Sequence, residues 1–399
     1  MTPTAPPAPP GPPTSALLSR LLGVDCLATN MAHLRSAMAD QRAERNEGVL
    51  SHVLGTRARL RAASQARNLS LRATNDSSIE TLRGAAVLLL VAYHSVEGAD
   101  VVVVEELRKD VLRYFTFSTE NIRMPLFTII SGYLYGQRPL DGPMLPFLKG
   151  KVRRLMGPFL TVSALSFALR IFVRGNESGL EIGDWWRIYF YRFEQFWYLP
   201  SLLLIFLLVV VLERQGLLAT PVRVFAATAT AVALRPVLSI ELFNLDGFIY
   251  LLPYFFLGCA VARFSFRPRR ERLVALVAIA SAGLVFQQIV WFSEIDVDVG
   301  RDSLLGTGIG MAVGAAALVL RRPVVWLASL GRFSFPIYLF HIFGIAVAVR
   351  VASVASISSE LATVALKIAF GVAVSLLAAQ VLSRNRWSAT LVLGTRWHK

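Results

Sequence analysis

Residues 82–95 read Leu-Arg-Gly-Ala-Ala-Val-Leu-Leu-Leu-Val-Ala-Tyr-His-Ser, and the apolar character continues beyond them. A helix needs about 20 predominantly apolar residues to cross a hydrocarbon core roughly 30 Å thick. Residues 83–104 therefore predict a transmembrane helix. This helix carries Arg83 at one end and His94 inside the run, so the segment that predicts the fold also holds its most unusual polar residues.

Nine similar apolar runs follow along the chain. Hydrophobic residues make up 55% of the sequence and charged residues only 17%. A soluble domain has roughly 45–50% and 25%, so this composition indicates a chain that is surrounded by lipid. We predict an all-α, polytopic membrane bundle with about ten transmembrane helices. The further segments are residues 120–136, 155–174, 195–213, 217–236, 247–264, 272–292, 302–320, 331–352 and 361–382.

The two ends of the chain differ from this membrane unit. Seven of the first 13 residues are proline, a composition that favours extended, unpacked chain. Residues 1–78 are interpreted as a disordered or partly helical, Pro- and Arg-rich cytoplasmic tail. Residues 79–383 are the predicted membrane domain, and residues 384–399 a short basic cytoplasmic tail.

The basic residues are placed as in a membrane protein. The net charge is +15, yet a nucleic-acid partner would require a basic stripe on a soluble fold, so none is expected. With a cytoplasmic N-terminus, the inner loops hold nineteen Lys and Arg and the outer loops seven. This asymmetry predicts both termini in the cytoplasm and a multi-pass protein of the inner or plasma membrane, in contact with membrane lipid.

Polar groups from three predicted helices share a similar depth. Arg83 and His94 are 11 positions apart, so they lie on one helix face about 16 Å apart. An ionisable residue near the bilayer midplane is a functional-site candidate. His341, Tyr338 on the same face of the ninth span, and Ser131 reach similar depths. The alternative for each is an interhelical hydrogen bond.

Several motifs occur in an order that resembles the acyltransferase-3 family of integral membrane acyltransferases. The first is an Arg-Gly pair at Arg83 followed by His94, with Thr81 where the family would have glycine. The others are Arg123–Phe127 continuing to Ser131-Gly132-Tyr133-Leu134, Arg153-Arg154-Leu155 before Pro158-Phe159, Phe196–Pro200, Pro253–Gly258, and Gly331-Arg332 through Ser334, Tyr338 and His341. The resemblance covers roughly residues 79–382.

This resemblance implies an enzyme. Family members transfer an acyl group, usually acetyl, from cytoplasmic acyl-coenzyme A to a hydroxyl of an extracytoplasmic glycan or glycolipid. His94 would be the general base, a role suited to histidine near neutral pH, and Arg83 would bind the donor or orient the site. No metal is expected. Coenzyme A phosphates would be bound by Lys149, Lys151, Arg153 and Arg154; the alternative for each of them is a topology signal only.

The acceptor is expected on the opposite side. Aromatic rings at Trp185, Trp186 and Trp197 suit sugar faces, although an interfacial aromatic belt is the alternative. Gln287 and Gln288 either hydrogen-bond acceptor hydroxyls or contact a neighbouring helix. Five arginines near outer helix ends favour an anionic acceptor if they line one cavity, and otherwise snorkel to headgroups. They are Arg123, Arg170, Arg174, Arg235 and Arg350.

Two interpretations from other classes compete with the enzyme. A transporter of a saccharide or lipid-linked saccharide would use midplane histidines as a proton relay, and would need no coenzyme A. A membrane scaffold would recruit partners through residues 1–78, so that truncation of the tail would abolish function.

The loop charges generate a topological prediction. Reporter fusions after Gly142 and Arg269 should report the cytoplasm, and fusions after Ser178 and Asp298 the exterior, because Lys and Arg are retained on the cytoplasmic side. Paired phosphatase and fluorescent-protein fusions measure this directly. Inversion of all four signals would contradict the predicted orientation.

Overall fold

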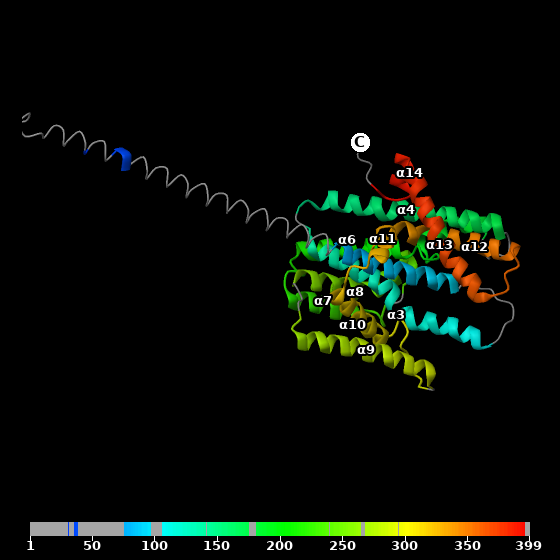
Figure 1. Cartoon of the computed structure of the whole chain (residues 1–399), viewed down its shortest axis with the longest axis horizontal. Coiled ribbons are helices and arrows are strands. Elements are labelled where there is room, and N and C mark those ends of the chain that lie inside the picture. The colour runs from blue at the N-terminus through cyan, green and yellow to red at the C-terminus, as the bar shows by residue number, and fades with distance from the viewer. Residues whose placement is uncertain are drawn as a thin grey trace, which may run out of the picture. The chain divides into compact units, whose positions relative to one another are not determined.

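In the computed structural model, the described residues form a bundle of helices that run side by side (Figure 1). The structure describes residues 76–96, 106–140, 142–174, 181–238, 240–264, 268–293 and 295–395, together with Met31 and residues 36–38. These residues form helices and no strands, which confirms the predicted all-α class. The helices of the bundle are Asp76–Val96, α3 (Glu106–Gln137), α4 (Met144–Arg174), α6 (Tyr198–Arg214), α7 (Pro221–Leu234), α8 (Leu245–Arg263), α9 (Arg270–Phe292), α10 (Leu304–Leu320), α12 (Ser334–Val354) and α13 (Glu360–Leu382).

Short helices connect or flank these elements. They are η2 (Ile182–Trp186), α5 (Arg187–Phe190), η3 (Leu242–Asn244), α11 (Val325–Arg332) and α14 (Arg386–Leu391). Polar side chains fix several helix starts: Ser303 accepts a hydrogen bond from the Gly306 N–H, and Ser359 from the Ala362 N–H. Such N-caps satisfy amide groups that have no partner inside the helix.

Six helices of the described residues are long and apolar enough to cross a membrane, or seven if the bent pair α10 and α11 counts as one span. The six are Asp76–Val96, α4, α8, α9, α12 and α13. Each of the ten predicted segments overlaps a helix, and residues 97–104 of the first segment lie outside the described residues. However, α6 has 17 residues and α7 has 14, and α3 is too polar by composition. The number ten, and the cytoplasmic location of both termini, therefore stay predictions.

Burial separates central from peripheral helices. Tyr254, Phe255 and Cys259 of α8 are fully buried, whereas α9 exposes Val274, Ile279 and other large apolar side chains. In Figure 1, α9 lies at one edge of the bundle and α4 at the opposite edge. Large apolar side chains on the outside are expected where the surrounding solvent is lipid.

Two pairs of glycines let backbones touch. An added Cβ at Gly132 of α3 would lie 2.0 Å from the Phe255 carbonyl oxygen of α8, and one at Gly258 would lie 2.0 Å from the Ile129 oxygen. Similarly, a Cβ at Gly84 would lie 2.0 Å from the Leu327 oxygen of α11, and one at Gly331 1.8 Å from the Glu80 oxygen. Small residues at such contacts are a general feature of membrane helix packing.

Hydrogen bonds close one end of the bundle, which we call the Asp76 end. Glu213 of α6 pairs with Arg263 of α8 and accepts a hydrogen bond from the Tyr135 hydroxyl at 3.1 Å. Glu80 pairs with Arg332 at 3.1 Å. The opposite end is the Val96 end.

The chain also separates into a unit of residues 1–73 and a unit of residues 74–399. The predicted tail lies almost wholly outside the described residues.

The glycine contacts generate the second prediction. Gly132→Ala should lower stability by about 1–3 kcal/mol, because an added methyl against backbone forces α3 and α8 apart. Gly308→Ala in α10 is the matched control, since nothing lies within 4 Å of its added Cβ. Thermal unfolding of the detergent-purified proteins measures the difference. Equal stability of the Gly132 variant and the wild type would contradict the contact.

Candidate active site

His94 lies beside His341 and lines a large cavity. The two ring centroids are 5.1 Å apart, and the Tyr93 ring centroid is 4.8 Å from that of His94. His341 is fully buried, and its Nδ1 donates to the Ile337 carbonyl at 2.9 Å. Its Nε2 is buried and has no hydrogen-bond partner within the described part of the chain. The structure therefore brings the two predicted histidines together.

The cavity has a volume of about 1280 Å³, larger than the roughly 300–1,000 Å³ typical of small-molecule sites. Its wall along α12 runs from Ile342 to Ser353, so it extends from His94 towards the Val96 end. Among the described residues, five arginines and two glutamates line it. They are Arg123, Arg170, Arg192, Arg301, Arg350, Glu120 and Glu194.

One wall of the cavity is the loop 191–197, which joins α5 to α6. Glu194 has a left-handed backbone (φ 44°), and its carboxylate is held by Arg170 at 2.5 Å and by the Ser166 hydroxyl at 2.7 Å. Both partners belong to α4. This attachment fixes the loop against α4, and with it Gln195 and Trp197, which also line the cavity. Non-glycine residues adopt this backbone conformation only where the surrounding contacts hold it.

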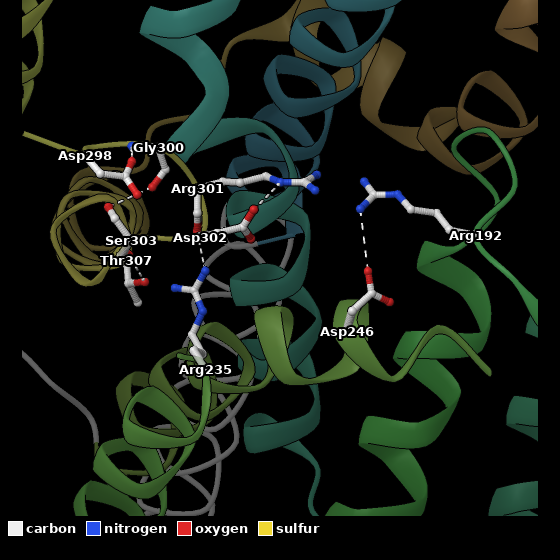
Figure 2. A network of polar contacts seen from close by, with 9 residues as sticks. All are labelled: Arg192, Arg235, Asp246, Asp298, Gly300, Arg301, Asp302, Ser303 and Thr307. Carbon is white, nitrogen blue, oxygen red and sulfur yellow. Dashed lines mark hydrogen bonds and ion pairs between the residues drawn. The ribbon is translucent and has the colours of Figure 1, made fainter. Parts of the chain in front are cut away.

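A second wall is braced by polar contacts around Arg301 (Figure 2). Arg235 donates to the Arg301 carbonyl oxygen, and the Ser303 hydroxyl donates to the Gly300 carbonyl at 2.9 Å. The Asp298 carboxylate accepts from the Gly300 N–H at 2.8 Å. The backbone that carries Arg301 is thus fixed on both sides of the residue.

Polar residues connect the cavity with Arg83 near the Asp76 end. The Tyr338 hydroxyl donates to the Gln195 carbonyl at 2.6 Å, and the Tyr338 ring lies 5.8 Å from that of Tyr198. Tyr198 is within hydrogen-bonding reach of Ser131 and close enough to Arg83 for electrostatic interaction. Ser131 also donates to the Phe127 carbonyl at 2.9 Å. Three of the predicted polar residues therefore lie along one path.

The predicted donor-binding cations lie on the first turns of α4. Arg154 interacts electrostatically with Arg83 and with Lys151, so these three cations gather at the Asp76 end. The Lys151 ammonium lies 3.8 Å from the centroid of the Phe206 ring. Lys149 is exposed and Arg153 half-buried. Among the described residues, no group of three or more His, Cys, Asp or Glu is placed to hold a metal ion.

The predicted acceptor residues separate into different places. Trp197 lines the cavity, whereas Trp185 and Trp186 are exposed on η2. Gln287 donates to the Phe117 carbonyl at 2.6 Å, and Gln288 accepts from the Ser118 hydroxyl at 3.1 Å. These two amides join α9 to α3 and are not among the cavity residues, so their geometry matches the alternative of a helix contact.

Three of the five arginines that the sequence placed near outer helix ends line the cavity: Arg123, Arg170 and Arg350. Arg235 instead supports the Arg301 backbone, and the Arg174 side chain lies outside the described residues. The sequence interpretation missed Arg192 and Arg301 because it considered arginines at helix ends and not those inside connecting loops. Both belong to the seven basic residues counted in the predicted outer loops, but that count was used only for the orientation of the chain.

Comparison with known proteins identifies the class and then the family. Several long apolar helices around a cavity with charged side chains define a multi-pass membrane protein. Residues 76–384 match the Acyltransferase domain of the acyltransferase-3 family, and the chain belongs to this family. Neither the comparison with curated proteins nor that with solved structures found a match. The sequence resemblance is thus confirmed, and it makes acyl transfer the class of activity.

The loop attachment generates the third prediction. Glu194→Ala should lower stability by about 1.5–3 kcal/mol, because it removes hydrogen bonds to a carboxylate whose side chain is only 6% exposed. Asp184→Asn, which breaks the exposed pair with Arg187, is the control and should leave the unfolding temperature unchanged. Thermal unfolding of the purified proteins compares the two. A shift as small in the Glu194 variant as in the control would contradict the attachment.

Proposed function

We propose that this protein is an O-acyltransferase of the inner or plasma membrane. It moves an acyl group, which we propose is acetyl, from acyl-coenzyme A to a hydroxyl of a glycan or glycolipid. The observation that carries the proposal is the position of His94, which lies beside His341 and lines a cavity that also holds several charged side chains, in a member of an acyltransferase family. A histidine that lines a cavity is available to a substrate, whereas one that only joins two helices need not be.

In the proposed reaction, His94 removes the proton from the acceptor hydroxyl as its oxygen attacks the thioester carbonyl. The new carbon–oxygen bond forms, the carbon–sulfur bond breaks, and the proton passes from His94 to the coenzyme A thiolate. Histidine suits both transfers because its ordinary pKa lies near neutrality. His341 supports the geometry by packing against the His94 ring.

The donor is proposed to bind from the Asp76 end. Arg83, Lys151 and Arg154 gather there, and guanidinium and ammonium groups bind phosphates strongly. Lys149 and Arg153 are on the same turns of α4 and complete the proposed phosphate-binding set. Contacts among Ser131, Tyr198 and Tyr338 connect Arg83 with Gln195 in the cavity wall.

The acceptor is proposed to bind from the Val96 end, which the loop charges predict to be extracytoplasmic. Trp197 offers a ring in the cavity wall, and exposed Trp185 and Trp186 lie on the same side of the chain's predicted topology. The two substrates would then approach His94 from opposite faces of the membrane. This separation explains why the site needs a membrane protein.

The fourth prediction tests His94 and Arg83. His94→Gln should reduce acetyl transfer by about 10²–10⁴-fold, because an amide replaces the hydrogen bond but not the base. Arg83→Lys should also be strongly impaired, because it keeps the charge and loses the planar fork. The measurement is label transferred from acetyl-coenzyme A to glycan in membranes that contain matched amounts of each variant.

Arg214→Lys is the matched control for the arginine, since Arg214 is an exposed residue at the end of α6 and should transfer at the wild-type rate. Interhelical hydrogen bonds in membranes average about 0.6 kcal/mol, so a merely structural histidine would tolerate glutamine. Near wild-type transfer by His94→Gln would refute the catalytic role.

A further inference from the structure

Two arginines from different loops face each other across the cavity. Figure 2 shows the guanidinium groups of Arg192 and Arg301 pointing towards the same space. Arg192 Nη1 lies 3.7 Å from Asp246 Oδ2, and Arg301 Nε lies 3.3 Å from Asp302 Oδ2. Each ion pair uses one nitrogen, while a guanidinium has five N–H donors. Most of the donors of both groups are therefore left for another partner.

Arg123 adds a third guanidinium to the same cavity. It is only 7% exposed, and its Cζ lies 3.4 Å from the centroid of the Tyr93 ring. Its Nη1 is buried and has no hydrogen-bond partner within the described part of the chain. A buried charged donor without a partner is costly. An anion that enters the cavity would therefore give Arg123 the hydrogen-bond partner that its Nη1 lacks.

Carboxylates nearby offset only part of this charge. Glu194 is used by Arg170, and Glu120 stands one turn from Arg123 on α3, whereas Arg350 adds a further positive charge to the lining. Burial first, and then Arg301, lowers the pKa of Arg192, while Asp246 raises it. The cavity lining thus stays positive, with like charges held close together.

Aromatic rings hold these arginines without neutralising them. The Arg192 Cζ lies 4.5 Å from the centroid of the Trp197 ring, and the Arg301 Cζ lies 5.9 Å from that of Tyr250. Rings orient a guanidinium plane while its charge is preserved. Together with the braced backbone of Arg301, this arrangement is preorganised for an anion.

We propose that the acceptor is anionic and that its phosphate or carboxylate binds among Arg123, Arg192 and Arg301. The proposal rests on the proposed acyl transfer and names the chemical class of the acceptor. Tyr93, which stacks on Arg123, directly precedes His94 in the chain. An acidic group held by Arg123 therefore leaves a neighbouring hydroxyl of the same molecule within the part of the cavity that His94 lines.

Binding of defined sugars tests the proposal. The full-length protein in phosphatidylcholine nanodiscs is titrated by calorimetry with glucuronic acid, glucose 1-phosphate and neutral glucose. The two anionic sugars should bind, and glucose should bind at least about tenfold more weakly, because hydrogen bonds to charged groups are the strong ones. Equal binding of glucose and the anionic sugars would overturn the proposal.

Variants locate the site. Arg192→Gln and Arg301→Gln should each weaken binding of glucuronic acid by about tenfold or more. Arg301→Lys, which keeps the charge, should bind with intermediate affinity and provides a test if the glutamine variant does not fold. Arg187→Gln is the control, since Arg187 is exposed at the same end and does not line the cavity. Unchanged binding by both cavity variants would exclude the site.

Two further arms separate the possible failures. His94→Gln should bind glucuronic acid like the wild type while it loses transfer, so failure of sugar binding and failure of catalysis are seen independently. Nanodiscs that contain phosphatidylglycerol should leave glucuronic acid binding unchanged. Displacement of the sugar by this lipid would assign the arginines to a lipid headgroup and refute the acceptor proposal.

Discussion

Direct backbone contact at four glycines is the constraint on which the rest of the structure depends. Gly84 and Gly331 bring the Asp76–Val96 helix against α11, and Gly132 and Gly258 bring α3 against α8. All four belong to the family motifs, which also contain the polar residues of the candidate site. A bilayer gives no hydrophobic force between helices, so close packing must supply the association energy. The motif glycines therefore set the separations that the polar residues require.

The position of the first helix follows from these contacts. Farther along it, Val91 packs against Gly371 of α13, whose added Cβ would also meet the His341 carbonyl oxygen at 3.5 Å. The helix is thus held between α11, α12 and α13 over most of its length. His94, one turn after Val91, is placed beside His341 as a consequence. Thr81 joins this arrangement by accepting a hydrogen bond from the Val324 N–H at 2.9 Å, which gives a structural use to the residue that departs from the family pattern.

Positively charged side chains gather in two separate regions of the site. Arg83, Lys151 and Arg154 gather at the Asp76 end, and a second group of arginines lines the cavity towards the Val96 end. Between them lie the side chains of Ser131, Tyr198 and Tyr338 and the paired rings of His94 and His341. Charges are costly inside a bilayer unless they face a cavity or a partner. This pattern supports the proposal that two charged substrates bring their reacting groups together between the two groups of cations.

The sequence by itself determined the helical class, the apolar segments and the family, because hydrophobic runs and ordered motifs are local properties of the chain. It also predicted that His94, His341 and Ser131 lie at similar depths, because depth follows from helix rise. Only the tertiary structure decided in which direction around its helix or loop each side chain points. It turned Trp197 and Arg301 into the cavity and Gln287 towards α3, since the direction in which a side chain points depends on which helices pack together, and those contacts join residues far apart in the chain.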